Sequence, residues 1–110
     1  MRIIAGSRRG AILTKLHAGN TRPTADRLRE SLFNILQGGR FGRLLANCHV
    51  IDLFAGTGAL GLEAVSRGAA FASFVENNGD ALAVLRANIA KLGFHSSTAV
   101  LAVDAVSLSH

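Results

Sequence analysis

A glycine-rich stretch is the first part of this sequence whose residue types and spacing could do chemistry. Gly56-Thr57-Gly58-Ala59-Leu60-Gly61 matches the pattern G-x-G-x-x-G, after an apolar run and before a helical stretch. In that context glycines let the backbone approach a ligand closely, and the N–H groups that begin the helix can point toward it. The stretch predicts a cofactor-binding turn, with a tight structural turn as the alternative.

Acidic residues stand at the ends of the apolar runs that accompany this turn. Glu76 follows Gly58 by 18 residues and ends the second run, where a carboxylate can accept both hydroxyls of a ribose. Asp104 ends the third run. Because neighbouring parallel strands end at one edge of a sheet, these residues predict a single site for a ribose-containing cofactor.

Asp52 bears on which cofactor this site would bind. It lies in the first apolar run, four residues before Gly56. A carboxylate there would repel the pyrophosphate of a dinucleotide, and it would attract the α-ammonium or the sulfonium of S-adenosylmethionine. This favours S-adenosylmethionine over NAD. The other interpretation of Asp52 is a structural acid that accepts hydrogen bonds from loop N–H groups.

The elements that must position these residues are short strands that alternate with helices. Apolar runs without polar alternation cover residues 50–54, 71–76 and 99–103, and helical spacing covers 59–67 and 80–92. This order is typical of a parallel sheet covered on both faces. It predicts an α/β fold that corresponds to one half of a doubly wound, Rossmann-like fold.

The first 45 residues differ from the rest in charge. They hold 9 Lys+Arg against 2 Asp+Glu, a net of +7, whereas residues 46–110 hold 3 against 5, a net of −2. A concentrated positive arm attracts polyanions such as nucleic acid. A solvated basic surface is the alternative interpretation. We expect residues 1–45 to form a basic unit and residues 46–110 to form the first half of a cofactor-binding domain.

The basic arm has predicted elements of its own. Residues 3–5 and 11–13 flank a loop that contains Arg8 and Arg9, which predicts a β-hairpin with arginines at its tip. Apolar spacing after Thr24 predicts a helix that ends at Gly38-Gly39. Three arginines near the start of that helix oppose its dipole and therefore indicate a partner: Arg22, Arg27 and Arg29.

Composition narrows the class of protein. With 110 residues, 49% hydrophobic and 17% charged, the chain can form one core and is not a disordered chain. The single cysteine excludes a disulfide framework and fits a cytoplasmic setting. No signal-peptide core and no membrane-spanning run is expected. No metal site is expected, because the histidines lack metal-ligand spacing: His17, His49, His95 and His110.

An Arg22-Pro23-Thr24 segment and an extended glycine motif, residues 52–64, occur together in this chain. With residues 1–6, 32–36 and 66–69, they resemble the bacterial RsmD-type 16S rRNA (guanine-N2)-methyltransferases. The resemblance implies methyl transfer from S-adenosylmethionine to the exocyclic amine of a guanine. The implied partner is small-subunit rRNA or a 30S assembly particle, and the implied enzyme is a monomer that does not bind a membrane.

The same resemblance implies roles for individual residues. The methionine end of the cofactor would be held by Asp52, Phe54, Ala55, Gly56, Thr57 and Gly58. The ribose would contact Glu76, with Asn77 beside it, and the adenine amine would contact Asp104 and Ala105. The segment Arg22, Pro23 and Thr24 would cover the cofactor. Contacts to rRNA would come from the hairpin and the helix, through Arg2, Arg8, Arg9, Arg22, Arg27 and Arg29.

Such amino-methyltransferases also carry an Asn or Asp followed by Pro-Pro and an aromatic residue, which holds the target amine and stacks on the flipped base. Pro23 is the single proline of this sequence, so the motif is absent and no catalytic residue is predicted. We expect the 110-residue chain alone to be inactive. Two alternatives stay open: a non-catalytic RNA-binding module, and an NAD-binding half-domain that Asp52 disfavours.

Overall fold

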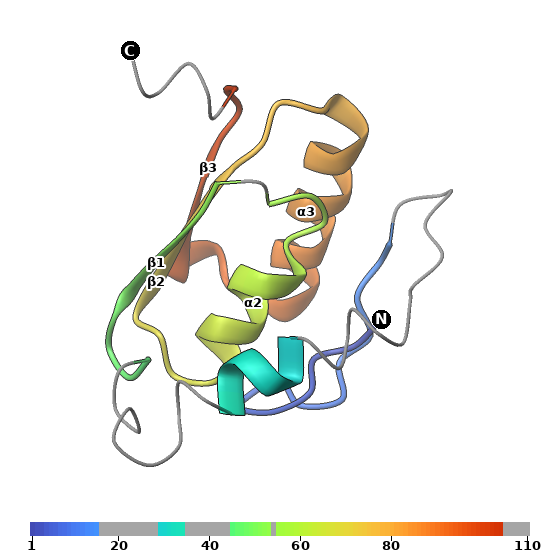
Figure 1. Ribbon diagram of the computed structural model, residues 1–110. Coiled ribbons are helices and arrows are strands. Elements are labelled where there is room, and N and C mark those ends of the chain that lie inside the picture. Colours follow the sequence, from blue (N-terminus) through green and yellow to red (C-terminus); the bar gives the residue numbers. More distant parts are fainter. Residues whose placement is uncertain (16–28, 35–44, 54, 105–110) are drawn as a thin grey trace.

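A computed structural model describes residues 1–15, 29–34, 45–53 and 55–104. Residues 29–34 are helical. The named elements follow in the order β1 (His49–Asp52), α2 (Ala59–Ser66), β2 (Phe71–Val75), α3 (Gly79–Leu92), the 3-10 helix η2 (His95–Ser97) and β3 (Thr98–Leu101) (Figure 1). The strands and helices predicted over residues 50–103 are therefore confirmed, with ends that differ by one or two residues.

The three strands form one parallel sheet in the order β1-β2-β3. Asp52 at the end of β1 lies opposite Phe74 of β2, and Val75 lies opposite Leu101 of β3. Both connecting helices, α2 and α3, lie on the same side of the sheet (Figure 1). The α/β class is confirmed, and the arrangement is compatible with part of a Rossmann-like fold.

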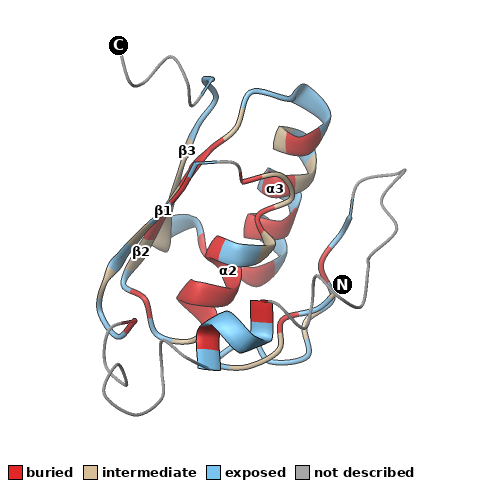
Figure 2. Cartoon of the chain, in the orientation of Figure 1, coloured by how far each residue is buried: buried red, intermediate tan, exposed pale blue. Residues whose placement is uncertain are grey.

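The main core lies between the sheet and the two helices. Leu62, Phe74 and Leu85 have no exposed surface; α3 is buried along one side, whereas the second half of α2 is buried all round (Figure 2). At Gly61 an added Cβ would lie 2.4 Å from Cε1 of Phe74, so glycine is what lets α2 approach β2 this closely. Ile3 from the N-terminal arm belongs to the same apolar cluster, so the arm packs on the core of the sheet.

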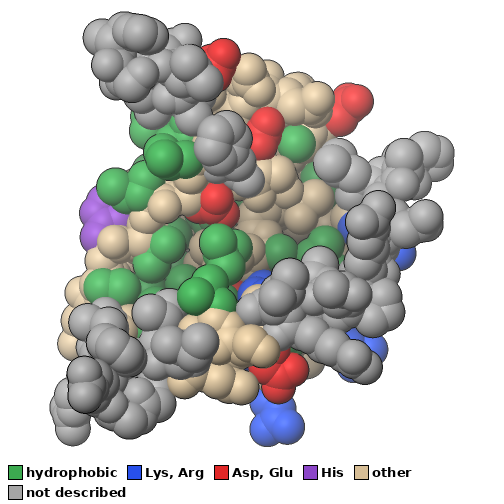
Figure 3. All heavy atoms as spheres, in the orientation of Figure 1, with side chains coloured by type: hydrophobic (Ala, Val, Ile, Leu, Met, Phe, Trp, Pro, Cys, Tyr) green, Lys and Arg blue, Asp and Glu red, His purple; other side chains and the backbone are tan. Residues whose placement is uncertain are grey.

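The other face of the sheet carries no helix from the described part of the chain. Ile51 of β1 is 62% exposed and Leu101 of β3 is 46% exposed, and hydrophobic side chains gather over the strands in the space-filling view (Figure 3). On this sheet, His49 Nε2 lies 2.9 Å from Ser73 Oγ. The prediction of a sheet covered on both faces is wrong for the described residues, because successive right-handed crossovers in one direction place their helices on one side.

The N-terminal hairpin is shorter than predicted. Its ladder is reduced to one antiparallel bridge, between Arg2 and Ile12, with Ile3 N donating to Ala11 O at 2.9 Å. The reason is that the next backbone donors turn to α2 instead, where Ile4 N and Ala5 N donate to the carboxylate of Glu63. The predicted hairpin is therefore present with short arms, since Gly10 N also donates to Ile3 O and Leu13 N to Met1 O at 2.8 Å each, and its loop is docked on α2.

In the described segments, no helix combines the length and the apolar character that a membrane crossing requires.

Candidate functional site

The structure brings Glu76 into direct contact with the glycine turn. Gly56 N donates to Glu76 Oε1 at 2.7 Å, and Oε2 accepts from Asn78 N at 3.0 Å and from Asn77 N at 3.2 Å. The N–H donors of Asn78 and Gly56 lower the pKa of Glu76, against a smaller opposing effect of burial. The site therefore holds an ionised carboxylate that stays partly exposed and can accept hydrogen bonds from ligand hydroxyls.

The turn between β1 and α2 has two glycines in the left-handed region, with φ of 55° at Gly56 and 90° at Gly58. An added Cβ on Gly58 would lie 2.4 Å from Cδ1 of Leu85, whereas one on Gly56 would meet nothing within 4 Å. Gly58 therefore serves the packing of the turn on α3. Gly56 leaves open space where a ligand can approach the backbone.

The remaining predicted acids lie at the same edge of the sheet. Asp52 is the last residue of β1 and is only 9% exposed. Glu76 N donates to Leu101 O at 3.1 Å, which joins the ends of β2 and β3. Asp104 is exposed and lies three residues beyond β3. The parallel register thus places these acids at one edge, as the sequence predicted, with Asp104 farthest along the chain from its strand.

The charge of this edge fits the cofactor chosen from the sequence. Residues 52–58 and 76–78 include acids and no Lys or Arg. A turn of this composition attracts a cationic group and offers acceptors to hydroxyls, and it repels a pyrophosphate. The chemistry of the site therefore suits a sulfonium nucleoside better than a dinucleotide.

Asn88 is a site residue that sequence reasoning missed. It has no exposed surface, its Oδ1 accepts from Thr14 N at 2.7 Å, and its Nδ2 donates to Thr14 O and to Thr57 O at 2.9 Å each. It therefore ties the N-terminal arm to the glycine turn. The available signal was a polar residue at a core position of the apolar stripe that contains Leu85 and Ile89.

Glu63 and Ser66 of α2, also missed, anchor the arm. Glu63 has no exposed surface and accepts from Ile4 N at 2.9 Å and Ala5 N at 3.1 Å. It also accepts from Arg67 Nε at 2.8 Å. Ser66 Oγ donates to Ala5 O at 2.7 Å, and Ser66 O accepts from Ser7 N at 2.7 Å. The pattern that could have revealed them is a pair of polar residues among the buried positions of a short helix.

The arginines predicted to contact RNA separate into two groups. Arg2 and Arg9 are exposed. Arg8 donates from Nε to Leu92 O at 2.8 Å, with its guanidinium carbon 4.9 Å from the centre of the Phe94 ring. Arg29 is 8% exposed, donates from Nη2 to Arg2 O at 2.8 Å and lies 3.8 Å from Glu63 Oε1. We correct the prediction for Arg29, because its buried guanidinium binds the arm instead of presenting itself to a polyanion.

Several predicted site residues lie outside the described residues: Arg22, Pro23, Thr24, Arg27, Phe54 and Ala105. For the segments that are described, no group of three or more His, Cys, Asp or Glu side chains could hold a metal ion.

Comparison with known proteins shows which family model matches the chain and which proteins are similar to it. The model of the family described as conserved hypothetical protein 95 matches residues 1–109. The chain is 46% identical over 76 residues to ribosomal RNA small subunit methyltransferase D of Escherichia coli strain K12, covering 69% of this chain and 36% of that protein. It is 38% identical over 99 residues to the protein of the same name from Haemophilus influenzae, covering 90% and 49%. The chain thus spans half or less of these two relatives.

Solved structures of methyltransferases resemble this chain in fold. The structure of yhhF from Escherichia coli superposes with a TM-score of 0.82 at 36% identity, over 98% of this chain and 55% of that one. The C-terminal domain of precorrin-6Y C5,15-methyltransferase from Rhodobacter capsulatus superposes with a TM-score of 0.63 at 19% identity, over 84% and 47%. The second likeness shows the fold alone. The parallel sheet and its helices are therefore part of a methyltransferase fold.

Proposed function

The chain belongs to the family described as conserved hypothetical protein 95, the RsmD family, and from this premise we propose that it provides the cofactor-binding part of an rRNA methyltransferase. The cofactor is S-adenosylmethionine, which supplies a methyl group on a sulfonium. The acceptor is the exocyclic N2 of a guanine in small-subunit rRNA. The names of the curated relatives support the rRNA substrate.

The contact between Glu76 and Gly56 is the observation that carries this proposal. An ionised carboxylate, oriented by three backbone N–H groups, lies beside a turn with open space above Gly56. Glu76 accepts the ribose hydroxyls, and Asp52 with the turn 55–58 attracts the cationic methionine end. Asp104 contacts the adenine amine. These residues bind and orient, and none of them transfers a proton.

The chemistry of the acceptor amine needs groups that these 110 residues do not include. A Pro-Pro pair cannot occur in a sequence with one proline. This supports the view that the 110-residue chain binds its cofactor and does not methylate RNA by itself. In the complete active site, positioning the amine in line with the sulfonium accounts for much of the rate enhancement.

The basic arm supplies the contacts to RNA. Arg2 and Arg9 are exposed, and the first 45 residues carry a net charge of +7. Docking of this arm on α2, through Glu63 and Ser66, gives the exposed arginines a defined position relative to the cofactor edge. The same exposed arginines favour the second candidate function, a non-catalytic RNA-binding module.

Titration calorimetry with S-adenosylhomocysteine tests the cofactor assignment and separates the two candidates. We expect binding by the chain, weakened about tenfold (roughly 1.4 kcal/mol) by Glu76→Gln, because a neutral amide accepts hydroxyl donors less well than a carboxylate. Asp80→Asn is the matched control, since Asp80 is an exposed acid in the first turn of α3. RNA binding without any heat from S-adenosylhomocysteine would favour the RNA-binding module. Stronger binding of NAD would refute the choice of cofactor.

A further inference from the structure

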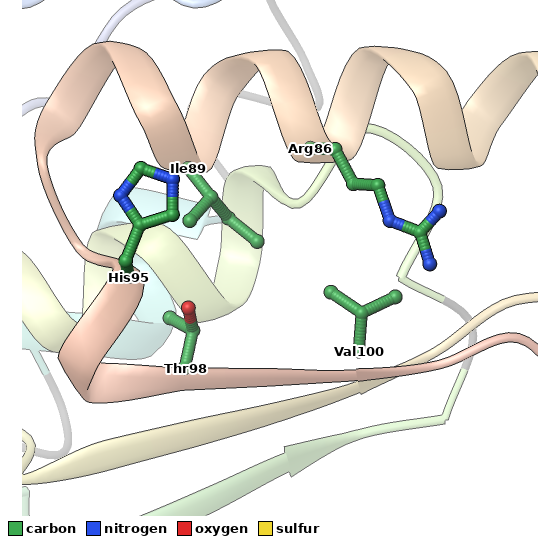
Figure 4. A pocket seen from close by; sticks show the side chains of 5 residues that line it. All are labelled: Arg86, Ile89, His95, Thr98 and Val100. Atoms are coloured by element: carbon green, nitrogen blue, oxygen red, sulfur yellow. The ribbon is translucent and has the colours of Figure 1, made fainter.

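A cavity of about 280 Å³ lies between α3 and β3, away from the glycine turn (Figure 4). It is lined by Arg86, Ile89, His95, Thr98 and Val100. Thr98 is the first residue of β3, so the cavity begins at the amino end of the strand, whereas Glu76 stands at the carboxyl edge of the sheet. The cavity is therefore separate from the cofactor site.

The lining combines apolar walls with nitrogen donors at both ends. Ile89 comes from α3 and Val100 from β3, so they form opposite apolar walls of the cavity, and Thr98 donates its hydroxyl to Phe94 O at 2.7 Å. Figure 4 shows Arg86 over Val100 and the ring of His95 at the other end. Both side chains are exposed, and neither has a hydrogen bond or ion pair with any other described residue. Among the described residues that line the cavity there is no carboxylate. A ligand that fits has a flat apolar part and an anionic part.

The His95 end of the cavity follows directly in sequence after a residue that the N-terminal arm contacts. Arg8 stacks on the ring of Phe94 and donates to Leu92 O, and His95 is the next residue after Phe94. Arg9 follows Arg8 and is exposed. This contact brings the arm close to the His95 end of the cavity, so RNA bound by the arm would lie near it.

We propose that this cavity is a subsite for one unpaired nucleotide of the bound RNA. The phosphate lies against Arg86 at one end of the cavity, and the base lies between Ile89 and Val100 with its edge toward His95. A volume of about 280 Å³ lies just below the range of ligand sites, which starts at about 300 Å³, so the cavity suits one base with its phosphate and is too small for a duplex. The proposal rests on the proposed function, because that function supplies the RNA.

A direct test is an NMR titration of the 110-residue chain with guanosine monophosphate and, separately, with uridine monophosphate, inorganic phosphate and a short acidic peptide. We expect the nucleotides to shift the His95 ring signals and the methyl signals of Ile89 and Val100. Equal shifts with phosphate alone would overturn the assignment of the base. Shifts with the acidic peptide only would assign the cavity to a protein partner, and no shifts at all would refute the site.

RNA binding by the same chain separates this proposal from the proposed function. For single-stranded RNA we expect the double variant Arg86→Gln/His95→Gln to bind about tenfold more weakly, with duplex RNA affected less. Lys91→Gln is the matched control, since Lys91 is an exposed base of α3 outside the cavity. Unchanged single-strand binding in the double variant refutes the subsite alone. If the chain binds no RNA but nucleotides still shift the cavity signals, the proposed function fails and the cavity remains a nucleotide site.

Discussion

Two carboxylates of this chain, Glu63 in α2 and Glu76 after β2, receive backbone N–H groups in similar ways and lie in different surroundings. Glu63 has no exposed surface and pairs with Arg67 at 2.8 Å. Glu76 is partly exposed, and among the described residues its hydrogen-bond donors are all backbone N–H groups. The carboxylate of Glu63 hydrogen-bonds within the protein, whereas the carboxylate of Glu76 is open on one side to a ligand. Burial and a cationic partner thus distinguish an acid that holds a fold from one that can bind a cofactor.

Among the predicted variants, removal of the buried carboxylate of Glu63 should lower the stability of the fold the most. Glu63→Ala leaves the guanidinium groups of Arg67 and Arg29 without their carboxylate and the N–H groups of Ile4 and Ala5 without an acceptor. We expect a loss of about 3–5 kcal/mol in the free energy of unfolding, measured by urea denaturation. Glu30→Ala, at an exposed acid of the helical residues 29–34, is the control and should change stability by less than about 0.5 kcal/mol. A loss below about 1 kcal/mol for Glu63→Ala would break the comparison.

Asn88 connects the two regions, and its replacement should have the next largest effect. Asn88→Leu leaves Thr14 N, Thr14 O and Thr57 O without their partner. Because Thr14 is exposed and Thr57 half-buried, water can replace part of these bonds, and we expect a total loss of about 1–3 kcal/mol in the free energy of unfolding. Hydrogen exchange at Thr14 N–H should accelerate in the same variant. Unchanged protection of that amide would mean that Asn88 does not hold the arm.

The pH dependence of the free energy of unfolding should show the contribution of ionised Glu76. Because its folded-state pKa is lowered from 4.5, ionised Glu76 stabilises the fold at pH values above 4.5, and this contribution is lost as the pH falls through the lowered pKa. The difference in stability between the wild type and Glu76→Gln should therefore be constant near neutral pH and shrink below pH 4.5. A difference that grows on acidification would contradict the hydrogen bonds to Glu76.

The smallest expected effects come from the two arginines of the hairpin, Arg9, which is exposed, and Arg8, which is half-buried. Arg9→Gln should reduce the slope of log affinity for RNA against log salt by about one unit and leave the melting temperature unchanged. Arg8→Gln should also lower the melting temperature, because Arg8 bonds to Leu92 O and stacks on Phe94. Equal melting temperatures of the two variants would contradict the inference that Arg8 stabilises the fold.

The cofactor edge could be predicted from the sequence because its signals are local. The glycine motif, the run that ends at Asp52 and the acid at Glu76 follow one another at fixed spacings, and a parallel sheet brings strand ends together without further information. The roles of Glu63, Ser66 and Asn88 could not be predicted this way. Each partner of these residues lies at least 31 residues away in sequence, apart from Arg67.

The sequence by itself determined the α/β class and the family resemblance, and it predicted that acids gather at one edge of the sheet, since these depend on periodicity and on motifs within one strand–turn–helix unit. Only the tertiary structure decided which charged side chains are buried against partners within the protein and which are exposed to solvent. Arg29 and Arg9 look alike in a count of basic residues, yet one is buried against Glu63 and the other is exposed. The physical reason is that a charge acquires its role from the groups packed around it, and residues distant in sequence supply most of those groups.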